Sequence, residues 1–231
     1  MCIPGGMNYR ALTISREYGS GGSEIAGIVA GSLGWRLLDD ALLVEISRAA
    51  NVQISEARTF DETIDPWICR LTRPLWGNSP DGFSAVVPVH LFDADEEAAF
   101  ADRIIRNAYD LGGCVVVGRG AQCVLRHQTD VFHAFVYANW RERIERVRSR
   151  HDSGADLDEV LRDMDERRLH YVRRHYRENR MDPHLYNLMV NCNNNPQLAA
   201  QVILTAMKAD EFGTALSHGS ACDLEALFNE S

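Results

Sequence analysis

The chain has 231 residues and a formal net charge of -9, and 45% of its residues are hydrophobic, enough for a substantial core. The acidic balance argues against a general binder of nucleic acids or of anionic membranes. Lys208 is the single lysine among 24 basic residues, so chemistry that requires a lysine elsewhere is excluded. Arginine binds planar anions better than lysine, but an arginine-favouring genome would give the same composition, and both explanations stay open.

Short apolar runs alternate along the chain with amphipathic helical stretches. This alternation predicts an α/β fold, in which a parallel sheet is covered by helices on both faces and ligands bind beyond the carboxyl ends of the strands. In chain order we expect a strand at 11–14, a helix at 23–33, a short strand-like segment at 35–38, a helix at 93–111, strands at 114–117 and 131–137, helices at 140–151 and 157–176, a strand at 188–192 and a helix at 196–208.

Residues 51–92 break this alternation. They hold four of the seven prolines and two of the four tryptophans, and we interpret them as a mobile, partly helical insertion that covers a site. Residues 10–210 are expected to form a single α/β domain that includes this insertion. Residues 1–9 are an N-terminal extension and 211–231 a loosely ordered tail in this interpretation.

The six cysteines show no metal-binding or redox spacing. No two of them form a CxxC pair, which argues against a zinc knuckle and against a thioredoxin-like site. Cys114 and Cys192 lie in apolar, strand-like runs, where a free cysteine acts as a small hydrophobic residue. We therefore expect reduced cysteines and a cytoplasmic location.

A glycine-rich loop follows the first strand and leads into the first helix. Such a loop has few Cβ atoms, so consecutive N–H groups can point at phosphate oxygens, and the helix adds the partial positive charge of its N-terminus. The alternative is a tight turn that binds nothing. The predicted donor phosphate-binding residues are Gly19, Ser20, Gly21, Gly22, Ser23 and Glu24.

This loop lacks the lysine of a complete phosphate-binding motif, GxxxxGK[ST]. Aligned on the glycines, Arg16 stands at the first glycine and Gly22 at the lysine. Either an arginine, with Arg16 the nearest candidate, supplies the bridging cation, or the loop holds phosphate without promoting its transfer. Ser23 and Glu24 occupy the next two places and are the remaining candidates for a magnesium contact.

Several segments together resemble one protein family in the right order over residues 10–208. They are TISREYGSGGSEIA, GWRLLDDALL, VVVGRGAQCVL, FVYANWRERIERVRSR, MDERRLHYVRRHY and DPHLYNLMVNCNNN. The chain resembles the cytidylate kinase-like branch of the nucleoside monophosphate kinases, least so over 51–92. This resemblance implies a P-loop NTPase-like three-layer α/β/α fold with a parallel sheet, a helical lid over about 160–182 and an acceptor-binding insertion.

The same resemblance implies roles for several residues. Arg119, in Gly118-Arg119-Gly120, matches an arginine that contacts the acceptor nucleotide. Asp165 and Arg168 match acceptor-binding positions, and Arg173 or Arg174 matches the lid arginines. Val117 and Gly120 stand where that family has carboxylates, which puts the handling of magnesium in doubt. The candidate catalytic residues are Arg16, Arg168, Arg173 and Arg174.

An arginine-rich run supports an anion site in the predicted lid. Residues 167–180 hold six arginines and one acid, Glu178, so this run carries +5 and the rest of the chain -14. Arg167, Tyr171 and Arg174 share one helix face by their spacing, and we add Tyr171 to the acceptor-binding candidates. The alternative is a solvated basic face.

Three other charged or polar groups have simpler expectations. We expect Asp39 and Asp40 to have one of three roles: capping the next helix, binding magnesium through water or contacting the acceptor. The alternating Arg and Glu of 140–150 predict an exposed, salt-bridged helix face. The histidines at 127, 133, 151 and 170 have no convincing ligand partners in the sequence.

We therefore expect a kinase that transfers the γ-phosphoryl group of ATP, with Mg2+, to a nucleoside monophosphate such as CMP or dCMP. Two alternatives stay open: a nucleotide-binding or regulatory protein with weak or no catalysis, and a kinase for another small metabolite. Nucleotide substrates are the expected partners, with no nucleic acid and no membrane, and a homodimer stays open.

Overall fold

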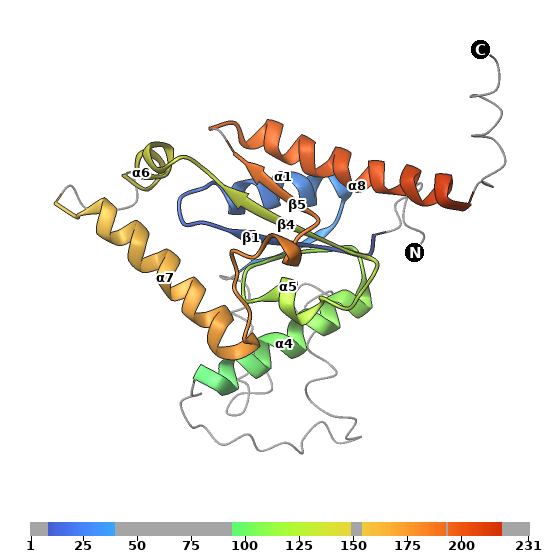
Figure 1. Cartoon of the computed structure of the whole chain (residues 1–231), viewed down its shortest axis with the longest axis horizontal. Coiled ribbons are helices and arrows are strands. Elements are labelled where there is room, and N and C mark those ends of the chain that lie inside the picture. Colours follow the sequence, from blue (N-terminus) through green and yellow to red (C-terminus); the bar gives the residue numbers. More distant parts are fainter. Residues whose placement is uncertain (1–8, 40–93, 149–153, 193, 219–231) are drawn as a thin grey trace, which may run out of the picture.

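The computed structural model describes residues 9–39, 94–148, 154–192 and 194–218. Its centre is a sheet of five parallel strands in the order β2-β3-β1-β4-β5, which confirms the predicted α/β class (Figure 1). The strands are β1 (Ala11–Arg16), β2 (Arg36–Leu38), β3 (Cys114–Val117), β4 (Val131–Tyr137) and β5 (Leu188–Asn191). Asp40, the predicted insertion over 51–92 and the part of the tail beyond 218 lie outside the described residues.

The sheet is covered by helices on both faces (Figure 1). Helices α1 (Gly22–Leu33) and α8 (Pro196–His218) lie on one face, and α4 (Ala94–Leu111) and the short α5 (Ala121–Val124) lie on the other. Alternate residues of the central strands point to opposite faces, so Leu12 and Ile14 pack with α1 whereas Ala11 packs toward α4. Each face thus has its own apolar core.

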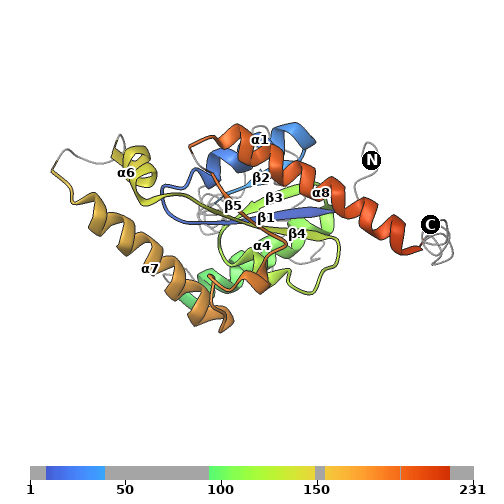
Figure 2. The same cartoon turned by 45° about the horizontal axis from the view of Figure 1, so that its top comes forward.

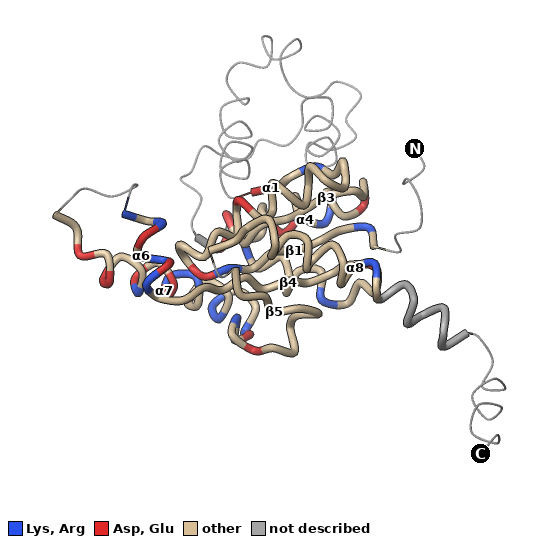
Figure 3. Tube along the Cα trace, turned by 90° about the horizontal axis from the view of Figure 1, so that it is seen from above, with Lys and Arg blue, Asp and Glu red and all other residues tan. Residues whose placement is uncertain are grey.

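Two further helices lie beyond the carboxyl ends of the strands, α6 (Trp140–Arg148) and α7 (Leu157–Tyr176) (Figures 1 and 2). The Asp156 carboxylate caps α7 by accepting hydrogen bonds from the N–H groups of Asp158 and Glu159. Both helices carry charges of both signs (Figure 3). The predicted lid segment therefore stands at the sheet edge where ligands of parallel sheets bind.

Two predicted element ends differ from the described structure by two residues or more. β1 continues past Ile14 to Arg16, so Ser15 and Arg16 belong to the strand, and both are buried. α8 continues past Lys208 to His218. Lys208 lies exposed on α8, on the face of the sheet opposite α4. The described cysteines, Cys114, Cys123 and Cys192, are free and buried.

His133 on β4 makes folding sensitive to acid. Its ring is buried, with Nδ1 2.7 Å from the hydroxyl of Thr13, and burial lowers the pKa of His133 from 6.5 to about 4. Between these values the unfolded chain binds the proton and the folded one does not, so the stability present above pH 6.5 is lost as pH falls toward 4.

We expect wild-type protein to lose about 2 kcal/mol more unfolding free energy between pH 7 and pH 5 than the His133→Gln variant. Urea titrations of both proteins at the two pH values measure this difference. Equal losses in the two proteins would contradict a buried, neutral His133.

Candidate functional site

The glycine-rich loop turns from β1 into α1 through two left-handed residues. Gly19 has φ 77° and Gly21 has φ 85°, conformations that favour glycine. Gly21 is the N-cap of α1, and no side chain caps its first N–H groups. Uncapped N–H groups at a helix N-terminus are donors for an anion. The Ser20 hydroxyl instead donates to the carbonyl of Glu17 at 2.9 Å, and Ser23 and Glu24 are exposed on the first turn of α1.

Gly22 explains in structural terms why this loop has no lysine. A Cβ atom at position 22 would lie 2.6 Å from Cβ and 2.9 Å from Cγ of Arg16. The Arg16 side chain therefore fills the space next to the backbone of Gly22, and a lysine at that place would collide with it. The arginine at the first glycine of the motif and the glycine at its lysine are two parts of one packing arrangement.

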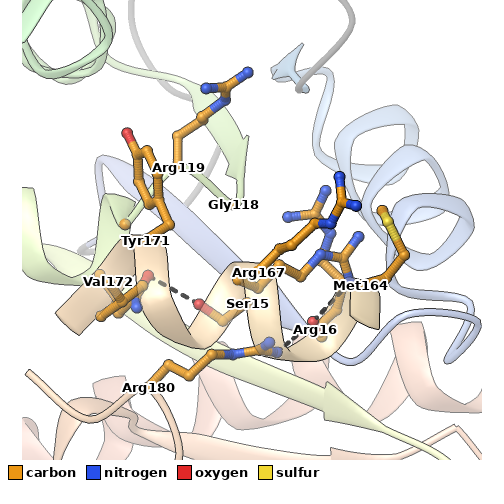
Figure 4. A pocket seen from close by; sticks show the side chains of 12 residues that line it. Ser15, Arg16, Gly118, Arg119, Met164, Arg167, Tyr171, Val172 and Arg180 are labelled. Carbon is orange, nitrogen blue, oxygen red and sulfur yellow. Dashed lines mark hydrogen bonds between the residues drawn. The ribbon is translucent and has the colours of Figure 1, made fainter. Parts of the chain in front are cut away.

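A cavity of about 280 Å³ lies between the ends of β1 and β3 and helix α7 (Figure 4). Five arginines line it, and no carboxylate is among the described residues of its wall. This concentration of cationic side chains is suited to an anion with several charged oxygens. Its lining is Ser15, Arg16, Gly118, Arg119, Gly120, Gln122, Met164, Arg167, Arg168, Tyr171, Val172 and Arg180.

Two of these arginines hold the end of β1. Arg168 donates a hydrogen bond to the carbonyl of Arg16 at 3.1 Å, and Arg180 donates to the same carbonyl at 2.6 Å (Figure 4). Arg180 follows α7 and is only 4% exposed. Burial lowers the pKa of Arg180, and the nearby carboxylate of Asp165 opposes this effect. Both side chains thus face the cavity and fix its floor.

Arg119 emerges beyond β3, as its position in the sequence predicts. Gly118, Arg119 and Gly120 are all left-handed, with φ of 80°, 51° and 69°. The Arg119 guanidinium pairs with Glu97 of α4 at 2.7 Å and lies 5.9 Å from the ring centroid of Tyr171. Its side chain thus bridges α4 and α7 at the wall of the cavity.

Two tyrosines of α7 pack beside this turn. The Tyr176 hydroxyl lies 2.6 Å from the carboxylate of Asp102 and 3.1 Å from the carbonyl of Arg119. Burial raises the pKa of Tyr176 and of Tyr171, and the positive charge of Arg119 partly offsets the effect on Tyr171. Both phenols are therefore neutral, and Tyr176 anchors the turn that presents Arg119.

A family model described as the cytidylate kinase-like family matches residues 11–194. The chain belongs to this family. An uncharacterized protein from Eubacterium ventriosum has a similar solved structure, with 21% identity and a TM-score of 0.61 over 86% of this chain and 98% of that one. At this identity the likeness concerns the fold of the cytidylate kinase-like chain.

Two kinases of known structure also align with the chain at lower similarity. A shikimate kinase from Acinetobacter baumannii is 14% identical with a TM-score of 0.48, covering 87% of this chain and 94% of its own. A gluconokinase from Sinorhizobium meliloti is 13% identical with a TM-score of 0.47, covering 92% and 99%. No curated protein matches this cytidylate kinase-like chain. Among its described helices, none is long and apolar enough to cross a membrane.

The structure brings some of the predicted residues of this family member together and leaves others apart. Arg16, Arg119, Arg168 and Tyr171 all line the cavity. Two predicted lid arginines do not, since Arg173 is exposed and Arg174 pairs with Asp95 at 3.1 Å on the surface. Asp39 follows β2 at the carboxyl edge of the sheet, outside the cavity lining, and Asp165 is held behind the glycine loop.

Arg143 and Arg146 of α6 contradict the prediction of a fully exposed helix face. The Arg143 side chain is 5% exposed, and its Nε donates to the carbonyl of Tyr18 at 2.7 Å. Arg146 donates to the carbonyl of Gly19 at 3.1 Å. Arg148, which pairs with Glu145 at 3.2 Å on the surface, fits the expected pattern. The contacts of Arg143 and Arg146 were not predicted, because residue spacing alone does not show that α6 packs against the glycine-rich loop.

The described residues do not form a magnesium site from protein side chains alone. No group of three or more His, Cys, Asp or Glu side chains there is placed to hold a metal ion. Ser23 and Glu24 offer one hydroxyl and one exposed carboxylate at the start of α1. This pair could supply only part of the octahedral coordination of magnesium, whose other ligands are usually waters and substrate phosphates.

Proposed function

We propose that the protein is a phosphotransferase that moves the γ-phosphoryl group of ATP to a nucleoside monophosphate of the CMP or dCMP type. The observation that carries this proposal is the five-arginine cavity, which has no carboxylate among its described lining residues and adjoins an uncapped, glycine-rich helix start. Membership of the cytidylate kinase-like family supports it. A phosphate on the acceptor is favoured because five guanidinium groups suit an acceptor that is itself an anion.

Phosphoryl transfer needs positioned reactants and stabilisation of the charge that develops between them. An oxygen of the acceptor phosphate attacks the γ-phosphorus in line, and the bond from this phosphorus to the bridging oxygen of ADP breaks. N–H groups at the start of α1 bind the donor phosphates, and Arg16 supplies the cation that Gly22 cannot. Arg119 and Arg168 orient the acceptor from the other side of the cavity.

A nucleotide-binding protein without transferase activity is the second candidate. The observation that favours it is the lack of space for a side chain at position 22, which excludes the usual lysine, together with the lack of a carboxylate among the described residues of the cavity wall. Such a protein would bind ATP or a nucleoside monophosphate at the same place without turnover.

A coupled assay of ADP release across the common nucleoside monophosphates tests the proposal. We expect turnover with CMP or dCMP above that with AMP, GMP and UMP, and none with hydroxylated acids that lack phosphate. Turnover with none of the nucleotides overturns the kinase proposal. If calorimetry then detects binding of ATP or CMP, the second candidate is supported. Turnover with another small metabolite would show that the acceptor is not a nucleoside monophosphate.

A further inference from the structure

Asp165 of α7 directs its carboxylate at the glycine loop. Oδ1 accepts a hydrogen bond from the N–H of Tyr18 at 2.8 Å, and Oδ2 is paired with Nη2 of Arg143. Nη1 of Arg180 lies 3.7 Å from Oδ1. Asp165 is absent from the lining of the five-arginine cavity and borders a second hollow with Glu17 and Arg180. Both of its oxygens are therefore engaged on the donor side of α7.

Arg143 completes the same attachment from α6. Its Nε donates to the carbonyl of Tyr18 at 2.7 Å, and its Nη1 lies 3.4 Å from the carboxylate of Glu17. Glu17 also accepts a hydrogen bond from the N–H of Ala138 at 3.2 Å. The N–H and the carbonyl of Tyr18 are thus both held by side chains, one from α7 and one from α6.

An acceptor role for Asp165 would undo this arrangement. Its carboxylate would have to leave the Tyr18 amide and the Arg143 guanidinium, whose side chain is 5% exposed. Removing one partner of a buried pair leaves the other charge without compensation, which costs more than the pair contributes. A donor loop, by contrast, gains from being fixed, because its amides then stabilise charge without reorganisation.

We propose that Asp165 is a positioning residue that fixes the glycine loop for the donor phosphates and ties α7 to that loop, and that it does not bind the acceptor. The inference rests on the proposed function for its kinetic consequences. Its geometric part, the tie between α7 and the Tyr18 backbone, is independent of the reaction.

Kinetics of the Asp165→Ala and Asp165→Asn variants test this role. Asp165→Ala should raise the KM for ATP about tenfold and lower kcat, because the loop amides are no longer held in place. The KM for the acceptor and the ranking of nucleoside monophosphates should stay within about twofold of wild type. Asp165→Asn keeps an acceptor for the Tyr18 amide, so its KM for ATP should lie between the values of wild type and Asp165→Ala. The matched control is Glu166→Gln, whose exposed carboxylate lies 3.5 Å from Nε2 of His170.

The opposite kinetic result overturns the proposal: an acceptor KM that rises, or a lost preference among nucleotides, with ATP affinity unchanged. Arg143→Lys provides a second variant if Asp165→Ala fails to fold. This variant keeps a positive charge but loses the forked contacts of the guanidinium. It should therefore weaken the binding of ATP and leave the KM for the acceptor unchanged.

Hydrogen exchange separates this inference from the proposed function. If wild-type protein turns over no acceptor, the kinase proposal fails, and the ATP dissociation constant from calorimetry then judges Asp165. Peptides spanning 16–22 should exchange faster in Asp165→Ala than in wild type or Glu166→Gln, with or without nucleotide. Unchanged exchange in this segment overturns the tie between α7 and the loop even for a protein that binds no ATP.

Discussion

Replacing Arg16 by alanine should lower turnover by a factor of about one hundred or more, as for the loss of a group that stabilises transition-state charge. Its guanidinium reaches the cavity from the end of β1, next to the helix start that is predicted to hold the donor phosphates. The backbone should stay in place in the variant, because Arg168 and Arg180 bind the Arg16 carbonyl and not its side chain. ADP release and circular dichroism measure the two effects.

A double variant at Arg16 and Gly22 tests whether the two positions depend on each other. Gly22→Lys alone should abolish activity, because its Cβ would lie 2.6 Å from Cβ of Arg16. In Arg16→Gly/Gly22→Lys the obstruction is gone and a lysine stands where the phosphate-binding motif has it, so part of the turnover should return.

The control for Arg16 is Arg148→Ala, which removes an exposed arginine of α6 that pairs with Glu145. This variant should match wild type in rate and stability, since exposed pairs contribute little. An Arg16→Ala enzyme as fast as this control would show that another arginine supplies the cation.

Replacing Gly120 by alanine should destabilise the fold by about 3 kcal/mol, the sum of a left-handed alanine and a steric overlap. Gly120 has φ 69°, and an added Cβ would lie 2.1 Å from Cε2 of Tyr176. The tyrosine ring cannot withdraw freely, because its hydroxyl is held between Asp102 and the carbonyl of Arg119. Urea unfolding measures the loss, and turnover should fall with it because the same turn presents Arg119.

Gly34→Ala separates the two causes. Gly34 has φ 63° and nothing within 4 Å of an added Cβ, so it reports the left-handed strain alone, about 1 kcal/mol. Adding Gly120→Ala to a Tyr176→Ala protein should likewise cost only about 1 kcal/mol. Equal losses for Gly34→Ala and Gly120→Ala in the wild-type background would show that Tyr176 does not press on the turn.

Local patterns were sufficient to predict the sheet and much of its covering. Runs such as 114–117 and 131–137 are predominantly apolar because both faces of a parallel strand are buried, and their bounds match β3 and β4. The glycine-rich turn between β1 and α1 was predicted by the same kind of local reasoning. The placement of Arg16, Arg119 and Arg168 around one cavity followed from strand ends and from the family resemblance.

Partners set by tertiary contacts were not predictable in this way. The arginines of 167–180 look alike in the sequence, yet Arg180 is buried against the end of β1 whereas Arg174 lies on the surface. What separates them is the left-handed Arg177, which ends α7 and turns the chain back toward the sheet. Arg143 was likewise hidden in a pattern typical of a solvated helix. Long-range packing, and not helical spacing, assigns these side chains their roles.

The five arginines of the cavity give it a positive charge that acylation of amines cannot remove. Amine acylation, which removes the charge of lysine, has no target there, because Lys208 stands exposed on α8. Guanidinium groups also keep their protons across the range in which proteins are folded. If the cavity binds phosphate as proposed, its affinity is therefore set by how α7 holds the arginines and not by acylation of its cations.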